Sequence, residues 1–260
     1  MAEYRSIAAK IATNTSRTCE APECAMPRFG FSKYCRAHRR AHERYGHPAG
    51  KPVSILQWRP HLHAATAFTG NWLSAGHPGI ESAVRWCADQ QAAHGQLKRA
   101  DSKRPWTTFF ATLHRGARQG VLPEELVART LAAFLALRVE PRLFAGGDAF
   151  NHALARLFLR TTPQPSDAWL KRRRGPDEHS QELPTINIAY RARDYTAARV
   201  IGAIGKLAYR AADEMFKGYE AERQAMNERI EHTRCPDPVA GSSAPFSSSA
   251  TTTASKGDLH

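Results

Sequence analysis

Three cysteines and one histidine near the N-terminus have the spacing of a metal site. Four residues separate Cys19 from Cys24, ten residues separate Cys24 from Cys35, and two residues separate Cys35 from His38. Three thiolates and one imidazole are a ligand set that a tetrahedral structural zinc takes. Because protein ligands fill all four positions of such a site, we expect the zinc to stabilise the fold without binding water or substrate.

Two further histidines leave the fourth ligand open. His42 and His47 follow His38 closely, and either is an alternative to it as a zinc ligand.

The chain has five cysteines, an odd number, and three of them lie in this one cluster, which favours metal binding in a reducing compartment over a disulfide framework. We therefore expect an intracellular protein, cytoplasmic or associated with the nucleoid. The isolated Cys87 lies in a helical pattern and is interpreted as a buried hydrophobic residue.

The residues that follow Ser32 predict a short helix that carries positive charge. Ser32 is a suitable N-cap for a helix over Lys33–Tyr45, and Gly46 suits the left-handed position that ends it. Basic side chains lie along this helix at Arg36, Arg39, Arg40 and Arg44. Three of them are spaced by four residues and share one face, which can contact phosphates or the guanine edges of a major groove. A solvated helix face with no ligand is the alternative.

The whole chain is strongly basic, with 37 Lys and Arg against 24 Asp and Glu and a net charge of +13. Such a charge indicates a polyanionic partner: DNA, RNA or an anionic membrane surface. The chain has no uninterrupted apolar stretch long enough to span a bilayer, and we expect no membrane partner. A second basic run consists of Lys171, Arg172, Arg173 and Arg174. It is interpreted as a phosphate-binding segment or as an unspecific tail.

The stretch CEAPECAMPRFGFSKYCRAHRRAHERYGHP, at the start of the range 19–50, resembles a known zinc-finger module. Phage and mobile-element proteins contain this module, in which a cysteine pair, a Cys-x2-His helix and an arginine-rich segment end in R-Y-G-x-P. The resemblance implies that the module binds nucleic acid, with Cys19, Cys24, Cys35 and His38 as its metal ligands. Some of these proteins continue into an HNH nuclease, but no His-Asn-His arrangement follows here, so nuclease activity is not implied.

Helix signals dominate the rest of the chain. Apolar residues recur at helical spacing, and Pro105 and Pro123 occupy positions typical of helix starts. The predicted helices are 2–12, 55–72, 80–97, 106–119, 124–139 and 148–159, and a long helix follows over 186–232. The predicted fold class is therefore mainly α, with a small N-terminal zinc module, a helical domain and a long C-terminal helix. The aromatic residues Trp106, Phe109 and Phe110 are interpreted as a core face, with base stacking as the alternative.

This organisation predicts six segments along the chain. They are an N-terminal extension (1–16), the zinc module (17–50), the helical domain (51–162), a basic Pro-rich linker (163–185), the long helical segment (186–232) and a disordered tail (233–260). The long segment is suited to self-association or to binding a partner protein, as one helix or as a hairpin.

No catalytic constellation stands out in the linear sequence. The pair His152 and Arg156 lacks the spacing of a tyrosine recombinase motif and is interpreted as a helix-surface pair. We therefore expect a zinc-stabilised nucleic-acid-binding protein, with duplex DNA as its first ligand and an accessory or regulatory role in a phage or mobile element. The alternatives are a protein-interaction adaptor with a structural zinc, and a divergent nuclease or recombinase.

Overall fold

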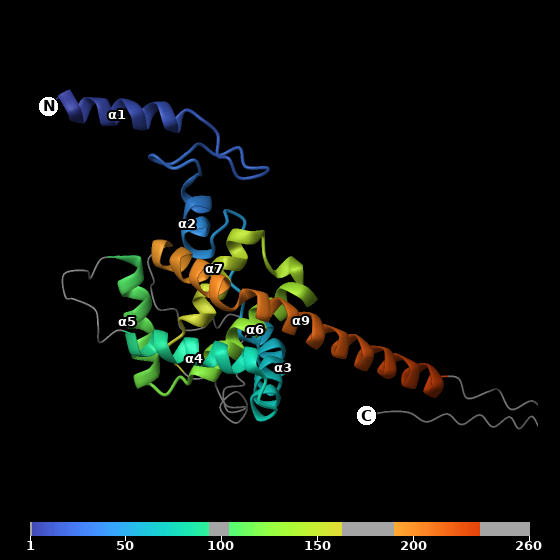
Figure 1. Cartoon of the computed structure of the whole chain (residues 1–260). Coiled ribbons are helices and arrows are strands. Elements are labelled where there is room, and N and C mark those ends of the chain that lie inside the picture. Colours follow the sequence, from blue (N-terminus) through green and yellow to red (C-terminus); the bar gives the residue numbers. More distant parts are fainter. Residues whose placement is uncertain (1, 94–103, 163–189, 235–260) are drawn as a thin grey trace, which may run out of the picture. The chain divides into compact units, whose positions relative to one another are not determined.

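The computed structural model describes residues 2–93, 104–162 and 190–234 and is mainly α-helical, as expected (Figure 1). In these ranges, β-type pairing is limited to one isolated bridge between Thr18 and Pro27. The helices are α1 (Ala2–Thr15), α2 (Arg36–Tyr45), α3 (Ile55–Ser74), α4 (Pro78–Ala92), α5 (Pro105–Arg118), α6 (Pro123–Val139), η3 (Pro141–Leu143), α7 (Gly147–Phe158) and α9 (Tyr190–Arg234).

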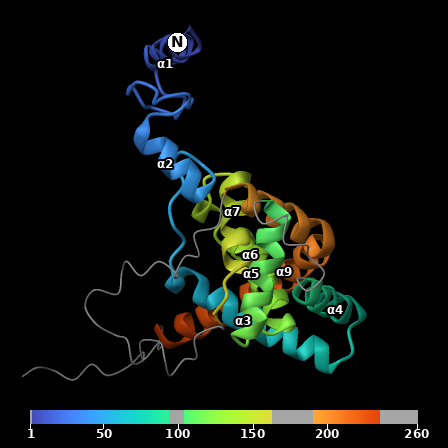
Figure 2. The same ribbon diagram turned by 90° about the vertical axis from the view of Figure 1, so that its left-hand side faces the viewer.

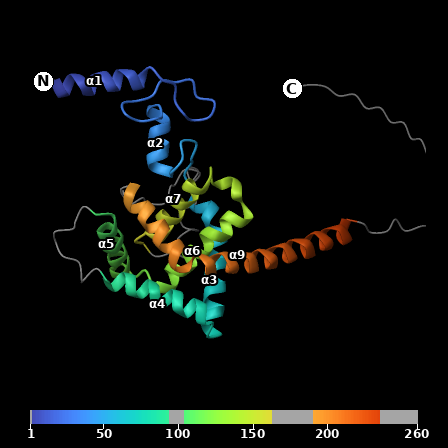
Figure 3. The same cartoon turned by 45° about the horizontal axis from the view of Figure 1, so that its top comes forward.

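Helix α6 forms the centre of the core because it is apolar on almost every side. All residues from Leu126 to Ala136 are buried, and α6 packs against α3, α4 and α7 (Figures 1 and 3). A helix with no polar face is stable in water only when neighbours cover it all round. Each surrounding helix accordingly turns one apolar face toward the core. On α5 this face includes Phe109, which is fully buried as the aromatic pattern predicted.

Helix α9 also contributes to this core. Val200, Ile204 and Ala208 are buried in the same cluster as the residues of α6. Tyr195 of α9 meets the ring of Phe109 at a centroid distance of 5.7 Å, so α9 lies beside α5 (Figure 2). The chain divides into two compact units, Met1–Gly218 and Tyr219–His260, and α9 contributes to both. Apart from the last residues of α9, the second unit lies outside the described residues.

Most helix boundaries lie within a few residues of the sequence prediction. Pro105 and Pro123 are the first residues of α5 and α6, and the long C-terminal helix forms a single segment without a hairpin. Cys87 is completely buried, as predicted for a core residue. The basic linker with Lys171, Arg172, Arg173 and Arg174 lies outside the described residues, and so does the predicted tail from residue 235 onward. Among the helices described, none is both long and apolar enough to cross a membrane.

A buried arginine anchors the end of the α7 segment to α6. The Arg129 side chain is 2% exposed and pairs with Glu125 at 2.7 Å. Its guanidinium also donates hydrogen bonds to the backbone carbonyls of Arg160 and Thr162. These carbonyls lie beyond the end of α7, so the charge of Arg129 holds the chain in place immediately before residue 163.

Candidate metal centre

Cys19, Cys24, Cys35 and His38 come together in space as their spacing predicted. Their ligand atoms, three sulfurs and one imidazole nitrogen, all lie within 4.8 Å of one another. Nδ1 of His38 lies 3.5 Å from the sulfurs of both Cys19 and Cys35, and the sulfurs of Cys24 and Cys35 are 4.0 Å apart. Neither His42 nor His47 belongs to this group, so His38 supplies its nitrogen ligand atom.

These separations fit a tetrahedral metal ion. A tetrahedron with metal–sulfur bonds of about 2.3 Å and a metal–nitrogen bond of about 2.05 Å has sulfur–sulfur edges of about 3.8 Å and sulfur–nitrogen edges of about 3.6 Å. The observed 4.0 Å and 3.5 Å agree with these edges to about 0.2 Å. Three of the six separations thus match a tetrahedral site, and with all four ligand atoms within 4.8 Å of one another the side chains could hold a metal ion.

The electrostatics of the cysteines also favour a cation. Burial raises the pKa of the Cys19 thiol, but the backbone amides of Ala21 and Cys35 donate hydrogen bonds to its sulfur and lower the pKa to about 6. At Cys24 the backbone amide of Met26 lowers the pKa, yet burial and the neighbouring sulfurs of Cys19 and Cys35 outweigh it and raise the pKa. Three thiolates this close together repel one another, and a bound cation would offset that repulsion.

The loop between α1 and α2 builds this geometry from backbone hydrogen bonds (Figure 3). The amide of Cys19 donates to the carbonyl of Met26, and the amide of Glu20 donates to the carbonyl of Lys33. Between the first two cysteines the chain reverses through Glu23, which adopts a left-handed φ of 61° that non-glycine residues seldom take. The loop is therefore shaped around the ligands, because the hydrophobic cluster beneath it contains only Cys19, Ala21 and Cys35 as buried members.

The start of α2 differs from the prediction. The helix begins at Arg36 with Cys35 as its N-cap residue, and the predicted helix from Lys33 with Ser32 as N-cap is wrong. The reason is that the backbone before Cys35 serves the loop, since the carbonyl of Tyr34 accepts a hydrogen bond from the amide of Phe29. The Ser32 hydroxyl accepts a hydrogen bond from the amide of Tyr34 instead of capping a helix.

Asn14 supports the loop from α1, although residues 1–16 are predicted to form a separate extension. Its amide nitrogen donates hydrogen bonds to the carbonyls of Gly30 at 2.7 Å and Ser32 at 2.9 Å. An asparagine in a polar stretch carries no sequence signal for such a contact, because its partners lie 16 and 18 residues away.

The cationic face of α2 is present in the structure. Arg36, Arg40 and Arg44 are exposed at successive turns of the helix. Arg39 differs from them, because its guanidinium pairs with the carboxylate of Glu43 at 2.8 Å and part of its charge is neutralised. Three exposed arginines therefore remain on one face beside the cysteine cluster.

The C-terminal end of α2 rests on the helical core, and His152 lies in this contact. Gly46 ends α2 with a φ of 77°, as predicted. The carbonyl of Arg44 accepts a hydrogen bond of 2.9 Å from the Arg193 guanidinium of α9. The interpretation of His152 as a surface residue is wrong, because its side chain is 1% exposed and its Nε2 lies 3.1 Å from Asp194. Burial, followed by the charge of Arg193, lowers the pKa of His152.

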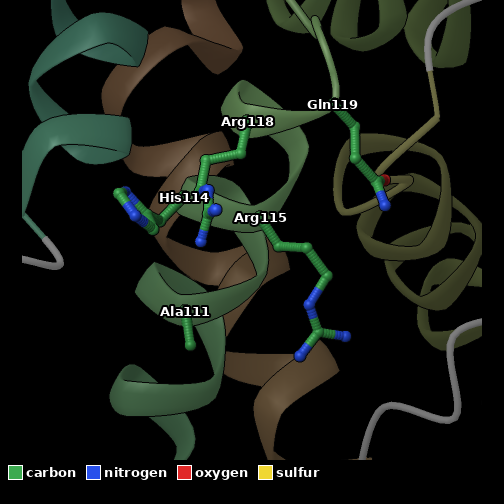
Figure 4. Close-up of a pocket in the computed structure, with 5 residues that line it drawn as sticks. All are labelled: Ala111, His114, Arg115, Arg118 and Gln119. Atoms are coloured by element: carbon green, nitrogen blue, oxygen red, sulfur yellow. The ribbon is translucent and has the colours of Figure 1, made fainter.

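A second basic feature lies on α5. A hollow of about 430 Å³ is lined by Ala111, His114, Arg115, Arg118 and Gln119 (Figure 4). The two arginines are exposed, and their guanidinium groups lie at this surface. The hollow thus brings together three basic residues of α5, His114, Arg115 and Arg118.

Comparisons of the chain with protein-family models, with curated proteins and with solved structures find no match. The cysteine and histidine cluster is therefore the main structural clue to function. In the part of the chain that the structure describes, no other group of three or more His, Cys, Asp or Glu side chains is arranged to hold a metal ion.

Proposed function

We propose that the protein binds nucleic acid, in the first instance duplex DNA, through a zinc-bound module at its N-terminus. Zinc is the metal of choice because three thiolates and one imidazole in a closed tetrahedron are its usual structural ligands. A closed site offers no position for water or substrate, so the ion stabilises the loop and takes no part in a reaction.

The exposed arginine face of α2 is the observation that carries the proposal. Arg36, Arg40 and Arg44 lie on a helix whose first turn contains a metal ligand, so the cysteine cluster fixes where the cations point. Guanidinium groups bind phosphates and guanine edges in a planar, two-pronged geometry. The net charge of +13 favours the approach of a polyanion to this face.

The test measures duplex binding by the zinc-loaded full chain as a function of salt. In the variant Arg36→Glu/Arg40→Glu/Arg44→Glu, we expect weaker binding and a salt slope that is smaller by about 3, because each phosphate contact contributes about 0.9 to the slope. The matched control reverses three exposed cations of α9, Lys206, Arg210 and Lys217, and changes the net charge equally. We expect this control to keep most of the slope.

Two outcomes oppose the proposal. Affinity that is equal at about 50 and 500 mM salt would exclude phosphate contacts as its source. Equal weakening in the α2 variant and in the α9 control would show that overall charge, and not the α2 face, determines binding. The zinc content and the circular dichroism spectrum of each variant are measured as controls, to check that the fold is retained.

The hollow on α5 supplies a second place where phosphates can bind. Its guanidinium groups, from Arg115 and Arg118, are exposed and spaced by three residues on one helix. A third arm of the same titration, Arg115→Glu/Arg118→Glu, is expected to lower the salt slope by about 2 if a duplex reaches both helices.

A further inference from the structure

The loop that carries the cysteine cluster exposes two aromatic side chains to solvent. Phe29 and Phe31 are 42% and 65% exposed, and every other phenylalanine in the described part of the chain is buried or partly buried. Met26, in the same loop, is 61% exposed. Leaving a phenyl ring in water forgoes about 1.5–3 kcal/mol of burial, so a pair of exposed rings on one loop indicates a surface that a ligand covers.

The backbone that carries these rings is fixed before any ligand binds. Gly30 lies between them with a φ of 58°, and the amide of Ser32 donates a hydrogen bond to the carbonyl of Phe29. Asn14 donates to the carbonyls of Gly30 and Ser32, which holds the tip of the turn from α1. Because the turn is already ordered, binding through the rings loses little conformational entropy.

Positive charge lies next to the Phe29 ring. The guanidinium carbons of Arg36 and Arg39 lie 5.7 and 5.6 Å from the centroid of the Phe29 ring. An apolar peptide that covered the loop would have to desolvate Arg36 without a compensating charge, since in the described part of the chain only Arg39 of the two is paired, with Glu43. A nucleic-acid strand, in contrast, offers aromatic bases for the rings and phosphates for the cations.

We infer that Phe29 and Phe31 form a stacking platform for unpaired nucleobases, so that the module binds the bases of a single strand or of a locally opened duplex in addition to its phosphates. The faces of bases inside a regular duplex are covered by their neighbours, and only unpaired bases present a free face to a phenyl ring. This inference rests on the proposed function, since the arginines of α2 are to hold the phosphates of the same strand.

The experiment compares three probes with the zinc-loaded full chain: a thymidine strand of about 20 nucleotides, an abasic strand of equal length, and a duplex of equal length. The abasic strand carries the same phosphates without bases. We expect the thymidine strand to bind about tenfold or more tightly than the abasic strand. In Phe29→Ala/Phe31→Ala this advantage is expected to disappear while the salt slope stays unchanged, because no phosphate contact is removed.

Two further variants serve as controls. Phe31→Trp keeps an aromatic ring at the tip and is expected to retain the preference for the thymidine strand. Tyr209→Ala removes an aromatic residue of α9 that is 57% exposed and is expected to leave all three affinities unchanged.

The failure of this inference can be distinguished from failure of the proposed function. Equal affinity of the native protein for the thymidine and abasic strands overturns the stacking platform and leaves phosphate binding by α2 intact. Unchanged binding of the thymidine strand by Phe29→Ala/Phe31→Ala also overturns the stacking platform. Weakened binding of the abasic strand by this variant overturns it too, because the rings would then stabilise the fold and not contact bases. Absence of binding to all three probes at about 50 mM salt overturns both the inference and the proposed function.

Discussion

Removal of the metal is expected to unfold residues 17–35 and to leave the helical core folded. The perturbation is a strong chelator applied to the full chain. The loop has almost no hydrophobic core of its own, because the buried residues of its cluster are only Cys19, Ala21 and Cys35. The core of α3, α4, α5, α6, α7 and α9 forms a separate cluster and includes none of these residues.

The magnitude follows from the contacts of the loop. Ordering the 19 residues of this segment costs about 1 kcal/mol for each residue, or about 19 kcal/mol. Burial of three small side chains contributes about 3 kcal/mol. Six backbone hydrogen bonds within the segment contribute about 1 kcal/mol each. The side-chain hydrogen bonds of Asn14, Arg28 and Ser32 reduce the remaining shortfall of about 10 kcal/mol by a few kcal/mol, and a structural zinc, which supplies about 10–16 kcal/mol at neutral pH, can cover it.

Amide hydrogen exchange with and without the chelator is the assay. The amides of Cys19, Glu20 and Phe29, which are hydrogen-bonded in the loop, are expected to lose protection when the metal is removed. Amides in the middle of α6, such as that of Leu131, are expected to keep theirs. One equivalent of zinc should restore the loop, and mass measurement under non-denaturing conditions gives the stoichiometry.

A protected loop in protein shown to be metal-free would refute this reasoning, because the segment would then be stable through its own contacts. Cys24→Ser, which removes one ligand, should lose zinc and expose the same amides. Cys87→Ala is the matched control: Cys87 is fully buried in the helical core, and burial raises the pKa of its thiol to about 12, so it does not compete for the metal. Loss of zinc from this control would show that the metal lies elsewhere.

Three further predictions concern residues around the site and the core. Arg129→Met should lower the free energy of unfolding by about 1–3 kcal/mol, because it removes the ion pair with the partly buried Glu125 and the hydrogen bonds to two backbone carbonyls; a loss below about 1 kcal/mol in urea titrations would contradict this. Asn14→Ala should weaken zinc binding about tenfold in competition with a coloured chelator, and unchanged affinity would show that α1 does not support the loop. Because the pKa of His152 lies below its ordinary value of 6.5, the unfolded chain binds the proton more readily, and stability should fall as the pH drops below about 6.5. His152→Gln should reduce that decline, and an equal decline in both proteins would assign it to other groups.

The cluster of Cys19, Cys24, Cys35 and His38 and most helices could be predicted from the sequence because their signals lie in residue type and short spacing. Cys35 and His38 are three residues apart, a spacing that brings their side chains close together within one helical turn. The apolar periodicity of α6 and the prolines at the starts of α5 and α6 act within one or two helical turns. The helix features need no distant contact, and the type and spacing of Cys19 and Cys24 indicate that they join Cys35 and His38.

The predictions for the start of α2 and for His152 are wrong because distant contacts override the local preference of the sequence there. Ser32 is a good N-cap residue, but the backbone after it pairs with residues 20 and 29, and the helix starts three residues later than expected. His152 lies in a helix with polar neighbours and looks like a surface residue until α9 brings Asp194 and Arg193 against it. These partners are 42 and 41 residues away, and no periodicity encodes them.

The contact between α2 and the core determines how the arginine face responds to loss of the metal. At Gly46 an added Cβ would lie 2.5 Å from the carbonyl oxygen of Asp148 and 2.7 Å from the ring of His152, so this junction requires glycine for space as well as for its left-handed φ. Helix α2 has only ten residues, too few to be stable alone, and it is held by the metal ligands at one end and by this junction at the other. Without the metal, the cations of α2 keep their charge but lose one of the two anchors that orient them. The metal should therefore raise affinity for nucleic acid by fixing the geometry of these cations, and this gain should persist at salt concentrations that weaken charge attraction alone.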